Sequence, residues 1–473
     1  MYSKDGVEYL YGIIKFMTQN EALDILKTGA NVFLTGEPGA GKTHTINNYV
    51  SYLRDHDIEP AITASTGIAA THIGGMTIHS WSGIGIKENF TKYDLDKIAS
   101  SEYVNRRVRR TKVLIIDEIS MLRAETLSMV DAVCREIKQN SEPFGGIQVI
   151  LVGDFFQLPP IEKNNFKQKQ KELIETKKAR FAYESETWRR LAPVICYLSE
   201  QYRQDDKDFL EILSAIRHDT FKKKHHEKLK ERHYKEKKFP ENITKLFSHN
   251  VDVDQVNEEM LAKIEGDLKE FEMDSSGKDF LVSNLKKGCL SPEKLFLKKG
   301  AVVMCTKNNP KERFVNGTLG VVEEFDSYSN NPIIKTKNGR KIEISPMDWT
   351  VEENGKIKAK ITQIPLRLAW AITVHKSQGM SMDAAVMDLS SVFEFGQGYV
   401  ALSRVRRLSG LYLLGINNQA LKVHPQILEQ DNIFRNESTE AQKTFGEISP
   451  GELKKMHKNF VLALDGKWKD KKI

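Results

Sequence analysis

The sequence is poor in cysteine and contains no long apolar run. It has four cysteines among 473 residues, and they form no CxxC pair (Cys134, Cys196, Cys289 and Cys305). This spacing excludes a disulfide framework and gives no zinc-ligand pattern, which favours a reducing compartment. No apolar run approaches the ~20 residues that cross a bilayer, and the N-terminus has neither a signal-peptide core nor a transit-peptide pattern. We therefore expect a soluble, cytoplasmic protein with no membrane partner.

A strong charge imbalance is absent from most of the chain. Lys and Arg number 71 against 64 Asp and Glu, a net charge of +7. Residues 222–238 alone hold nine Lys/Arg and three Glu, or +6. We expect this run to be a solvated helix or loop. The balanced remainder is compatible with a nucleic-acid partner but does not prove one.

The composition is that of a globular chain with several cores. Hydrophobic residues make up 40% and charged residues 29%, which excludes a disordered or collagenous protein. At about 150 residues per domain, the length predicts about three domains. Thr18 and Glu21 are spaced as a capping box that opens a helix at Gln19.

The first half alternates short apolar runs with helical patterns, which is typical of a parallel α/β sheet. Buried strands are predicted at 31–35, 60–63, 112–116 and 147–152, and a helix at 123–139. Each strand ends at a small or acidic residue. That end is the carboxyl edge, where such sheets bind ligands.

The second half also alternates short apolar runs with helical patterns, but less regularly. A second α/β core is predicted from apolar runs near Ile195 and at 243–247, 301–305, 385–387 and 411–414. Between 309 and 362, turn residues punctuate short β-branched stretches, with Asn-Gly dipeptides at 338–339 and 354–355. This pattern of short β-branched stretches separated by turn residues predicts a small antiparallel barrel inserted into the second core.

The segment GEPGAGKT at 36–43 follows the apolar run VFLT and precedes a helical pattern. This is the phosphate-binding loop GxxxxGK[ST] in the strand–loop–helix context that it requires. Backbone N–H groups and the helix N-terminus would hold a polyphosphate. Lys42 would reach the β- and γ-phosphates, and the Thr43 hydroxyl would hold Mg²⁺.

Two further strand ends carry candidate catalytic groups. In VLIIDEIS, Asp117 would bind Mg²⁺ and Glu118 would orient and deprotonate the attacking water. By itself, such an Asp-Glu pair is more often a helix N-terminus. In GDFFQLPP, Asp154 could simply cap its strand, whereas Gln157 could bond both the γ-phosphate and the attacking water. Together with the phosphate loop, these residues indicate an NTPase.

Phosphoryl transfer also needs a cation over the transferring phosphate, often an arginine from another domain. Arg203 in EQYR and Arg404 in YVALSRV are the candidates. Charge alone favours neither, because most basic residues are surface residues.

Taken in order, these motifs resemble the Pif (petite integration frequency) helicases of superfamily 1, group B, relatives of RecD and the phage Dda helicase. The resemblance covers about 18–420. Gln19 matches the Q motif. Arg203 lies in motif IV. The other segments, in chain order, are GEPGAGKT, ASTGIAA, TIHSWSGIG, IIDEIS, GDFFQLPP, ITVHKSQGMS and YVALSRV. The stretch VDAVCREIKQNSEPFGGIQVI and the segment QIPLRLAWAITVHKSQG are also family-like.

The resemblance implies an α/β fold with two RecA-like P-loop NTPase cores and ATP in the cleft between them. It divides the chain into core 1A at 1–194, with a wedge insertion within about 72–105, and core 2A at 195–308 and 363–435. A Src-homology-like barrel at 309–362 is inserted into core 2A, and a helical tail follows at 436–473. It implies ATP and Mg²⁺ as cofactors. The implied nucleotide-binding residues are Gln19, Pro38, Gly39, Ala40, Gly41, Lys42, Thr43, His44, Gly379 and Arg404.

A helicase must hold DNA of any sequence, so it binds phosphates and stacks on bases. Candidate DNA-binding residues in the first core are Ser65, Thr66, Gly67, Thr77, His79 and Ser80. Thr373, His375 and Lys376 would match them in the second core, if the resemblance holds. Ser65–Gly67 could also be an ordinary turn. Trp81 could equally stack on a base or pack in the core.

The implied activity is ATP-driven 5′→3′ movement on single-stranded DNA with unwinding of duplex, forked or G-quadruplex DNA; RNA–DNA hybrids also remain open. A monomer in solution is expected, with a dimer on DNA as the alternative. A nucleic-acid-binding switch without processive unwinding is the competing function. A small-molecule kinase is disfavoured, because it would not need a second core with its own arginines.

Overall fold

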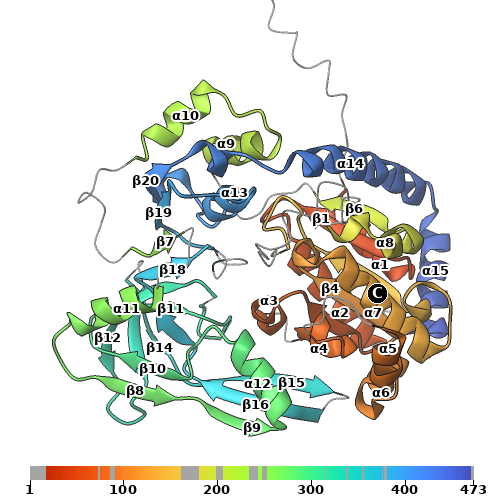
Figure 1. Cartoon of the computed structure of the whole chain (residues 1–473), viewed down its shortest axis with the longest axis horizontal. Helices are drawn as coiled ribbons and strands as arrows, with labels where there is room; N and C mark the ends of the chain where they lie inside the picture. Colours follow the sequence, from red (N-terminus) through yellow and green to blue (C-terminus); the bar gives the residue numbers. More distant parts are fainter. Residues whose placement is uncertain are drawn as a thin grey trace, which may run out of the picture.

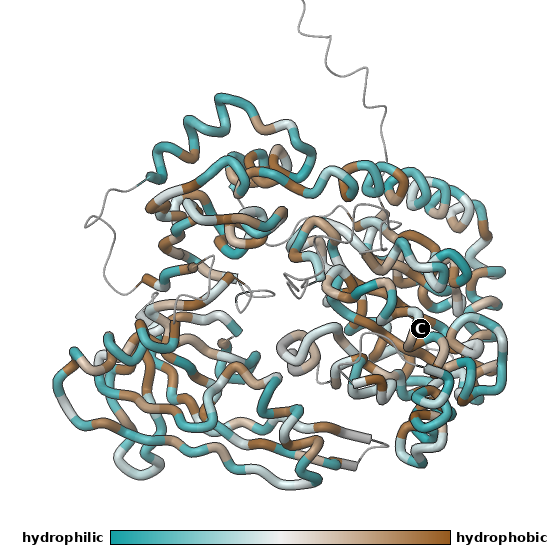
Figure 2. Tube along the Cα trace, in the orientation of Figure 1, coloured by the Kyte–Doolittle hydropathy of each residue, from teal (hydrophilic) through white to brown (hydrophobic). Residues whose placement is uncertain are grey.

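We describe the fold from a computed structural model of the chain. It describes residues 17–72, 75–85, 91–160, 181–198, 206–233, 243–247, 253–309, 311–314, 316–336, 339–353, 356–374, 377 and 381–469. Two α/β bodies lie side by side, and a β-rich region extends from the second of them (Figure 1). Hydrophobic residues concentrate along the strands and on the inner faces of the helices (Figure 2).

The first body is built on a parallel sheet with the strand order β3-β2-β4-β5-β1-β6. Its strands are β1 Val32–Gly36, β2 Ala61–Ala64, β3 Met76–Thr77, β4 Val113–Asp117, β5 Gln148–Val152 and β6 Val194–Leu198. The four strands predicted in the first half are confirmed. Their continuous apolar runs are explained by helices on both faces of the sheet.

Helices cover the two faces of this sheet and bury two separate hydrophobic clusters against it. The Thr18–Glu21 capping box at the start of α1 is confirmed, as is the helix predicted at 123–139. The helices of this body are α1 Gln19–Lys27, α2 Lys42–Asp55, α3 Gly67–His72, α4 Ile78–Ser82, α5 Lys92–Ala99, α6 Glu102–Arg110, α7 Ala124–Lys138 and α8 Glu186–Leu191.

The second body has its own parallel sheet, with the order β18-β7-β19-β20. The strands are β7 Lys245–Phe247, β18 Ala371–Thr373, β19 Ala385–Leu389 and β20 Leu411–Ile416. The helices are α9 Lys207–Arg217, α10 Lys223–Lys230, α11 Val253–Ala262 and α13 Gln397–Leu402. Helix α10 lies in the Lys-rich run, which confirms the predicted helix for its described part.

The β-rich region consists of antiparallel sheets with the orders β14-β13-β12-β11-β17, β15-β16-β9 and β10-β8. Helix α12, Asp279–Gly288, packs beside them. The strands are β8 Lys269–Glu272, β9 Asp274–Gly277, β10 Lys294–Leu297, β11 Val302–Cys305, β12 Leu319–Phe325, β13 Pro332–Thr336, β14 Lys341–Glu343, β15 Met347–Glu353, β16 Lys356–Gln363 and β17 Leu366–Leu368. Antiparallel pairing is as predicted. The Src-homology-like barrel stays a prediction.

Three predicted assignments are wrong. The strand near Ile195 is β6, which pairs with β1 in the first sheet, so it does not open the second core. The run at 301–305 is β11, which pairs antiparallel with β12 and β17. The antiparallel region therefore begins near β8 and not at 309. An apolar run predicts a strand, but which strand it pairs with depends on the positions of the other strands in the folded chain.

The wedge predicted within about 72–105 stays a prediction; within this range, β3 pairs with β2 in the first sheet. The helical tail is confirmed, but it begins earlier than residue 436. It consists of α14, Pro425–Gly446, and α15, Pro450–Ala463. Both helices return to the first body, where α14 runs along β6 and α15 contacts α1 (Figure 1). The described part of the chain thus has both its first helix, α1, and its last helix, α15, on the first body.

Helix α14 is anchored by an aromatic cluster. The Phe434 ring centroid lies 5.2 Å from that of Phe33, 6.1 Å from Phe155 and 6.2 Å from Trp188. Phe434→Ala should lower the free energy of unfolding by about 3–5 kcal/mol, because it removes a buried ring and leaves a cavity. Chemical denaturation would measure this. Ile433→Ala is the matched control, since Ile433 is 49% exposed and should change stability by under about 0.5 kcal/mol. Equal effects would contradict the anchoring.

Candidate functional site

The phosphate-binding loop lies between β1 and α2, and its glycines are required by geometry. Gly39 and Gly41 have φ angles of 94° and 87°, which L side chains rarely adopt. A Cβ atom on Gly41 would lie 2.1 Å from the Gln19 amide nitrogen. The Lys42 ammonium donates to the carbonyls of Gly36 at 2.7 Å and Glu37 at 3.1 Å. The loop is therefore shaped to bind a phosphate.

The remaining predicted nucleotide residues in the first body surround this loop. The Gln19 side chain donates to the Ala40 carbonyl at 3.3 Å, and Pro38 lies within the turn. Thr43 and His44 are exposed in the first turn of α2. Their roles toward a nucleotide stay predictions.

The Asp-Glu pair lies at the carboxyl end of β4. The Asp117 carboxylate accepts the Glu118 N–H at 2.8 Å, and Glu118 itself has a left-handed backbone with φ 52°. Such strain at a non-glycine residue is typical of functional sites. The pKa of Glu118 is raised to about 7, mainly by burial and in part by the Asp117 carboxylate, while the charges of Lys42 and Arg404 oppose this rise. Charges from both bodies thus act on one carboxyl.

Arg404 reaches the site from the second body. It follows α13, is 1% exposed, and donates to the Val400 carbonyl at 2.8 Å and to the Ser403 hydroxyl at 2.7 Å. Gln157 comes from the loop after β5 and is also buried. Helix α13, which leads to Arg404, lies against the loop that carries Gln157, since a Cβ on Gly396 would lie 2.6 Å from the Phe156 carbonyl oxygen. The charges of Lys42 and Arg404 both act on Glu118.

The donor set fits a magnesium ion. Strands β4 and β1 both flank β5, so Asp117 and Thr43 follow strands that end at the same edge of the sheet. Burial raises the pKa of Asp117. The hydrogen bond from the Glu118 N–H and the charge of the Lys42 ammonium both lower this pKa, and a bound divalent cation would lower it as well. A carboxylate and a hydroxyl are oxygen donors of the kind that Mg²⁺ binds beside nucleotide phosphates.

Two groups of predicted DNA-binding residues lie at the carboxyl ends of β2 and β3, which are adjacent strands. The Ser65 N–H donates to the Asp117 carbonyl at 3.1 Å, while its buried hydroxyl finds no hydrogen-bond partner among the residues that the structure describes. Thr66 caps the following turn by accepting the Ala69 N–H at 3.2 Å. A Cβ on Gly67 would lie 3.0 Å from the Gly288 Cα of α12. Ser65 thus links this candidate DNA site to the carboxylate pair.

The second group surrounds α4. Thr77 is its N-cap and accepts the Ser80 N–H at 3.2 Å, and burial lowers the pKa of His79. The Ser80 hydroxyl also accepts the Asn284 amide at 3.2 Å, a contact from α12 that sequence reasoning missed. Trp81 is 2% exposed and belongs to the main hydrophobic cluster, which supports core packing over base stacking.

The second-body candidates are less fully placed. Thr373 ends β18 and is buried. Arg203, His375, Lys376 and Gly379 lie outside the described residues, so their roles stay predictions.

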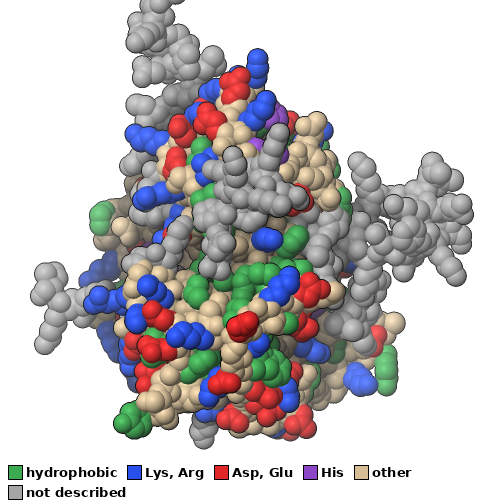
Figure 3. Space-filling view, turned by 90° about the vertical axis from the view of Figure 1, so that its left-hand side faces the viewer, with side chains coloured by type: hydrophobic (Ala, Val, Ile, Leu, Met, Phe, Trp, Pro, Cys, Tyr) green, Lys and Arg blue, Asp and Glu red, His purple; other side chains and the backbone are tan. Residues whose placement is uncertain are grey.

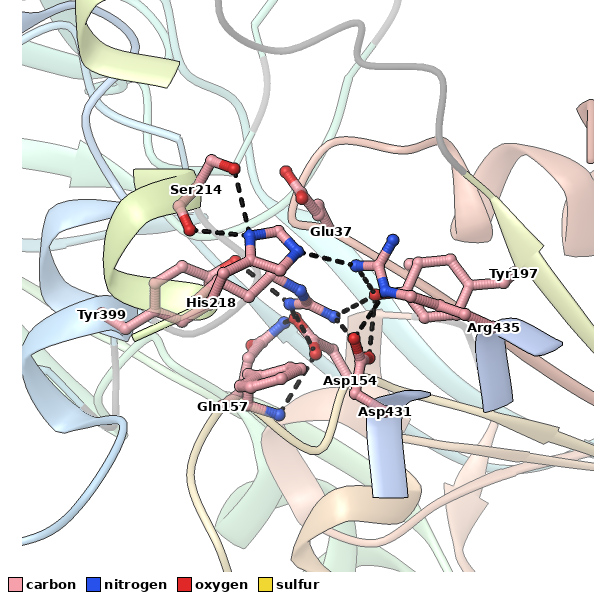
Figure 4. A network of polar contacts seen from close by, with 12 residues as sticks. Glu37, Asp154, Gln157, Tyr197, Ser214, His218, Tyr399, Asp431 and Arg435 are labelled. Carbon is pink, nitrogen blue, oxygen red and sulfur yellow. Dashed lines mark hydrogen bonds and ion pairs between the residues drawn. The ribbon is translucent and has the colours of Figure 1, made fainter. Parts of the chain in front are cut away.

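Sequence reasoning also missed the partner of Asp154. Arg217, on α9, places its Nη1 atom 2.9 Å from both Asp154 carboxylate oxygens. Figure 4 shows Asp154 inside a polar network that includes Tyr197, Tyr399 and Asp431. No signal marks Arg217 in the sequence, because it occurs in an ordinary amphipathic helix 63 residues away from Asp154.

Glu118→Gln should separate ATP binding from turnover. The amide keeps the shape of the side chain but cannot accept a proton, so hydrolysis should fall about 10²-fold or more while a fluorescent ATP analogue still binds. Single-turnover kinetics would measure the loss. Glu125→Gln, at the start of α7, is the control and should hydrolyse ATP normally. Lost ATP affinity with normal turnover would make Glu118 a structural or metal-binding group.

Comparisons with known proteins show the family of the chain. The family model described as PIF1-like helicase matches residues 17–227. The chain is 41% identical to "ATP-dependent DNA helicase Pif1" from Psychrobacter sp. (strain PRwf-1), over 95% of this chain and 75% of that protein. It is 36% identical to "ATP-dependent DNA helicase PIF1" from Xenopus laevis over 87% of this chain, and the match spans 63% of that longer protein.

Solved structures are similar as well. Bacteroides sp Pif1 in complex with ADP-AlF4 matches with a TM-score of 0.76 and 29% identity, over 89% of this chain and 97% of that chain. Bacteroides Pif1 bound to ssDNA matches with a TM-score of 0.61 and 29% identity, over 89% and 97% of the two chains.

The fold and the site define a P-loop NTPase with two RecA-like cores. The phosphate loop, the carboxylate pair and the second-core arginine follow one another in this order along the chain. The chain belongs to the PIF1-like helicase family. In the described part of the chain, no helix is both long enough and apolar enough to span a membrane.

Proposed function

We propose that this chain is an ATP-dependent DNA helicase that moves 5′→3′ on single-stranded DNA and unwinds duplex or forked DNA. The observation that carries the proposal is the contact between the two cores: helix α13, which leads to Arg404, touches the first-core loop at Phe156, and the charge of Arg404 acts on Glu118 of the first core. An NTPase site divided between two cores couples hydrolysis to their relative movement. The names of the relatives and the single-stranded DNA complex support DNA as the partner.

In this proposal, each residue has one task during ATP hydrolysis. Lys42 binds the β- and γ-phosphates, Glu118 accepts the proton of the attacking water, and Gln157 orients that water. Arg404 stabilises the charge that develops on the transferred phosphate, as would Arg203. Thr43 and Asp117 would hold Mg²⁺, which supplies further charge neutralisation when bound.

The adenosine side of the site would use Gln19 and His44, with Gly379 from the second core. Pro38 to Gly41 would wrap the phosphates through their backbone. These assignments follow the family motifs, and the position of Gln19 against Ala40 supports the first of them.

Movement on DNA follows from two groups of DNA-binding residues, here called grips, that hold the DNA phosphates alternately. The first grip is formed by Ser65, Thr66, Gly67, Thr77, His79 and Ser80. The second is formed by Thr373, His375 and Lys376. If ATP binding closes the cleft and hydrolysis opens it, each cycle advances the strand by about one nucleotide. The hydrogen bond between Ser65 and Asp117 supports coupling of the first grip to the ATP site.

Further parts of the proposal concern substrates and organisation. G-quadruplexes and RNA–DNA hybrids are proposed as additional substrates, with a monomer in solution and a dimer on DNA. The wedge is proposed to be the helical part of 72–105. An intracellular, reducing location is supported by the four cysteines, which are free thiols. On the face drawn in Figure 3, basic and acidic side chains intermix, so a DNA path there would not depend on a continuous basic patch.

A strand-displacement assay on tailed duplexes tests the proposal. Duplexes with a 5′ tail should be unwound with ATP and Mg²⁺, whereas duplexes with a 3′ tail should not. DNA-stimulated hydrolysis without displacement on any tailed substrate would favour the ATP-driven switch over the helicase. The Glu118→Gln protein, which should bind DNA and displace no strand, controls for unwinding by binding alone.

A further inference from the structure

We propose that Arg217 is a positioning residue for ATP hydrolysis. It fixes the position of the loop that carries Gln157 relative to helix α13, the helix that leads to Arg404. The inference rests on the proposed function and adds a residue that none of the sequence motifs contains. Arg217 is 1% exposed, and Asp154 is 0% exposed, so the pair lies outside the reach of solvent.

The first step runs from Arg217 to Gln157. Arg217 binds both oxygens of the Asp154 carboxylate at 2.9 Å. The same carboxylate accepts the Phe156 N–H at 3.2 Å and lies 3.5 Å from the Gln157 amide nitrogen. The Arg217 guanidinium also stacks 4.0 Å from the centroid of the Phe156 ring. Arg217 therefore fixes the turn from which the Gln157 side chain projects (Figure 4).

The second step runs from Arg217 to α13. The Nη1 atom that binds Asp154 also donates to the Tyr399 hydroxyl at 3.2 Å. Gly396, at the start of the same helix, touches the loop directly, since a Cβ there would lie 2.6 Å from the Phe156 carbonyl oxygen. Arg404 follows the end of this helix and donates back to the Val400 carbonyl at 2.8 Å. One guanidinium thus spans the Gln157 loop of the first core and the Arg404 helix of the second.

The third step ties this pair to α14. The Nη2 atom of Arg217 donates to the Tyr197 hydroxyl at 2.8 Å, which in turn donates to Asp431 at 2.9 Å. Arg435 donates to the other Asp431 oxygen at 2.6 Å. Two guanidinium groups and two carboxylates make the network neutral. Because buried charges are stable only when paired, the network favours one arrangement of β6, α9, α13 and α14.

The guanidinium group is suited to this task, and an ammonium is not. The two terminal nitrogens serve different elements at fixed angles, one for Asp154 and Tyr399 and the other for Tyr197. A lysine would keep the charge beside Asp154 but would lose this planar fork. Arg217→Lys is therefore the informative variant, because it leaves the buried carboxylate with a counterion.

Steady-state kinetics of DNA-stimulated ATP hydrolysis test the inference. Arg217→Lys should lower kcat on the order of tenfold, the scale expected when a catalytic group is slightly misplaced, and change KM for ATP by less than about twofold. Arg232→Met is the matched control. Arg232 donates to the carbonyls of Leu411 at 3.0 Å and Ser409 at 2.8 Å inside the second core, so its loss should lower the melting temperature and leave kcat unchanged.

A double-mutant cycle distinguishes positioning from general stabilisation. If Arg217 acts through Gln157, Arg217→Lys should add less than about twofold to the loss caused by Gln157→Ala. A kcat for Arg217→Lys within twofold of wild type, or multiplicative effects of the two changes, would overturn the inference. Should Arg217→Lys fail to fold, Tyr399→Phe replaces it in the cycle with the same expected non-additivity.

The wild-type protein separates this inference from the proposed function. Unwinding by wild type together with normal turnover by Arg217→Lys would leave the helicase proposal standing and overturn the inference alone. Hydrolysis without unwinding by wild type would overturn the helicase proposal, while the kinetic cycle would still decide the role of Arg217. Absence of hydrolysis by wild type would overturn both.

Discussion

Arg404→Ala should reduce the rate of ATP hydrolysis on the order of 10³-fold, the scale of losing an arginine finger. Arg404 lies in the second core, yet its charge acts on Glu118 beside the phosphate loop. Binding of single-stranded DNA, measured by fluorescence anisotropy without nucleotide, should persist because the predicted grips lie elsewhere. Arg404→Lys should restore little activity, since a point charge does not reproduce the planar fork.

Arg406→Ala is the matched control for Arg404→Ala. Arg406 lies two positions further along the chain and forms a surface pair with Asp383 at 3.6 Å; such exposed pairs contribute little to stability. This variant should hydrolyse ATP and unwind normally. Melting temperatures of both variants would show whether a loss of rate reflects unfolding. If folded Arg404→Ala hydrolysed ATP at the wild-type rate, Arg404 would have no catalytic role and the helicase proposal, which rests on it, would fail.

Lys42→Ala should abolish measurable ATP hydrolysis. In the proposed mechanism, the ammonium is the positive charge that the loop presents to the β- and γ-phosphates, and it also orders the loop by donating to Gly36 and Glu37. Both contributions disappear together in the alanine variant. Initial rates of phosphate release with saturating DNA would measure the loss, and DNA binding should remain largely intact.

Lys27→Ala provides the control, because Lys27 pairs with Asp24 within the helix that precedes the loop and lies over the Tyr52 ring. This variant should change the rate little. Hydrolysis near the wild-type rate by folded Lys42→Ala protein would show that this loop does not bind the nucleotide.

Local patterns in the sequence were sufficient for the parts of the site that lie on single strand–loop units. The apolar run before 36–43, its glycines and Lys42 define the phosphate loop within a few residues, as do VLIIDEIS for Asp117 and Glu118. The positive φ angles of Gly39 and Gly41 explain why these positions are glycine. Such features are predictable because the residues that determine them are neighbours in the chain.

Strand order was not predictable in the same way. The run near Ile195 was correctly predicted as a strand but assigned to the wrong core, since β6 joins β1. The run at 301–305 was likewise a strand but belongs to an antiparallel sheet. Hydrophobicity determines that a segment is buried, whereas the choice of partner depends on the path of the whole chain.

The sequence by itself determined the class of chemistry: a phosphate loop, a carboxylate pair and a second-core arginine in a recognisable order. Only the tertiary structure decided that Trp81 packs in the core, that α14 returns to β6, and that Asp154 pairs with Arg217. These features depend on contacts between residues far apart in the chain. A buried charge must find its counterion in space, and no local pattern records where that counterion will be.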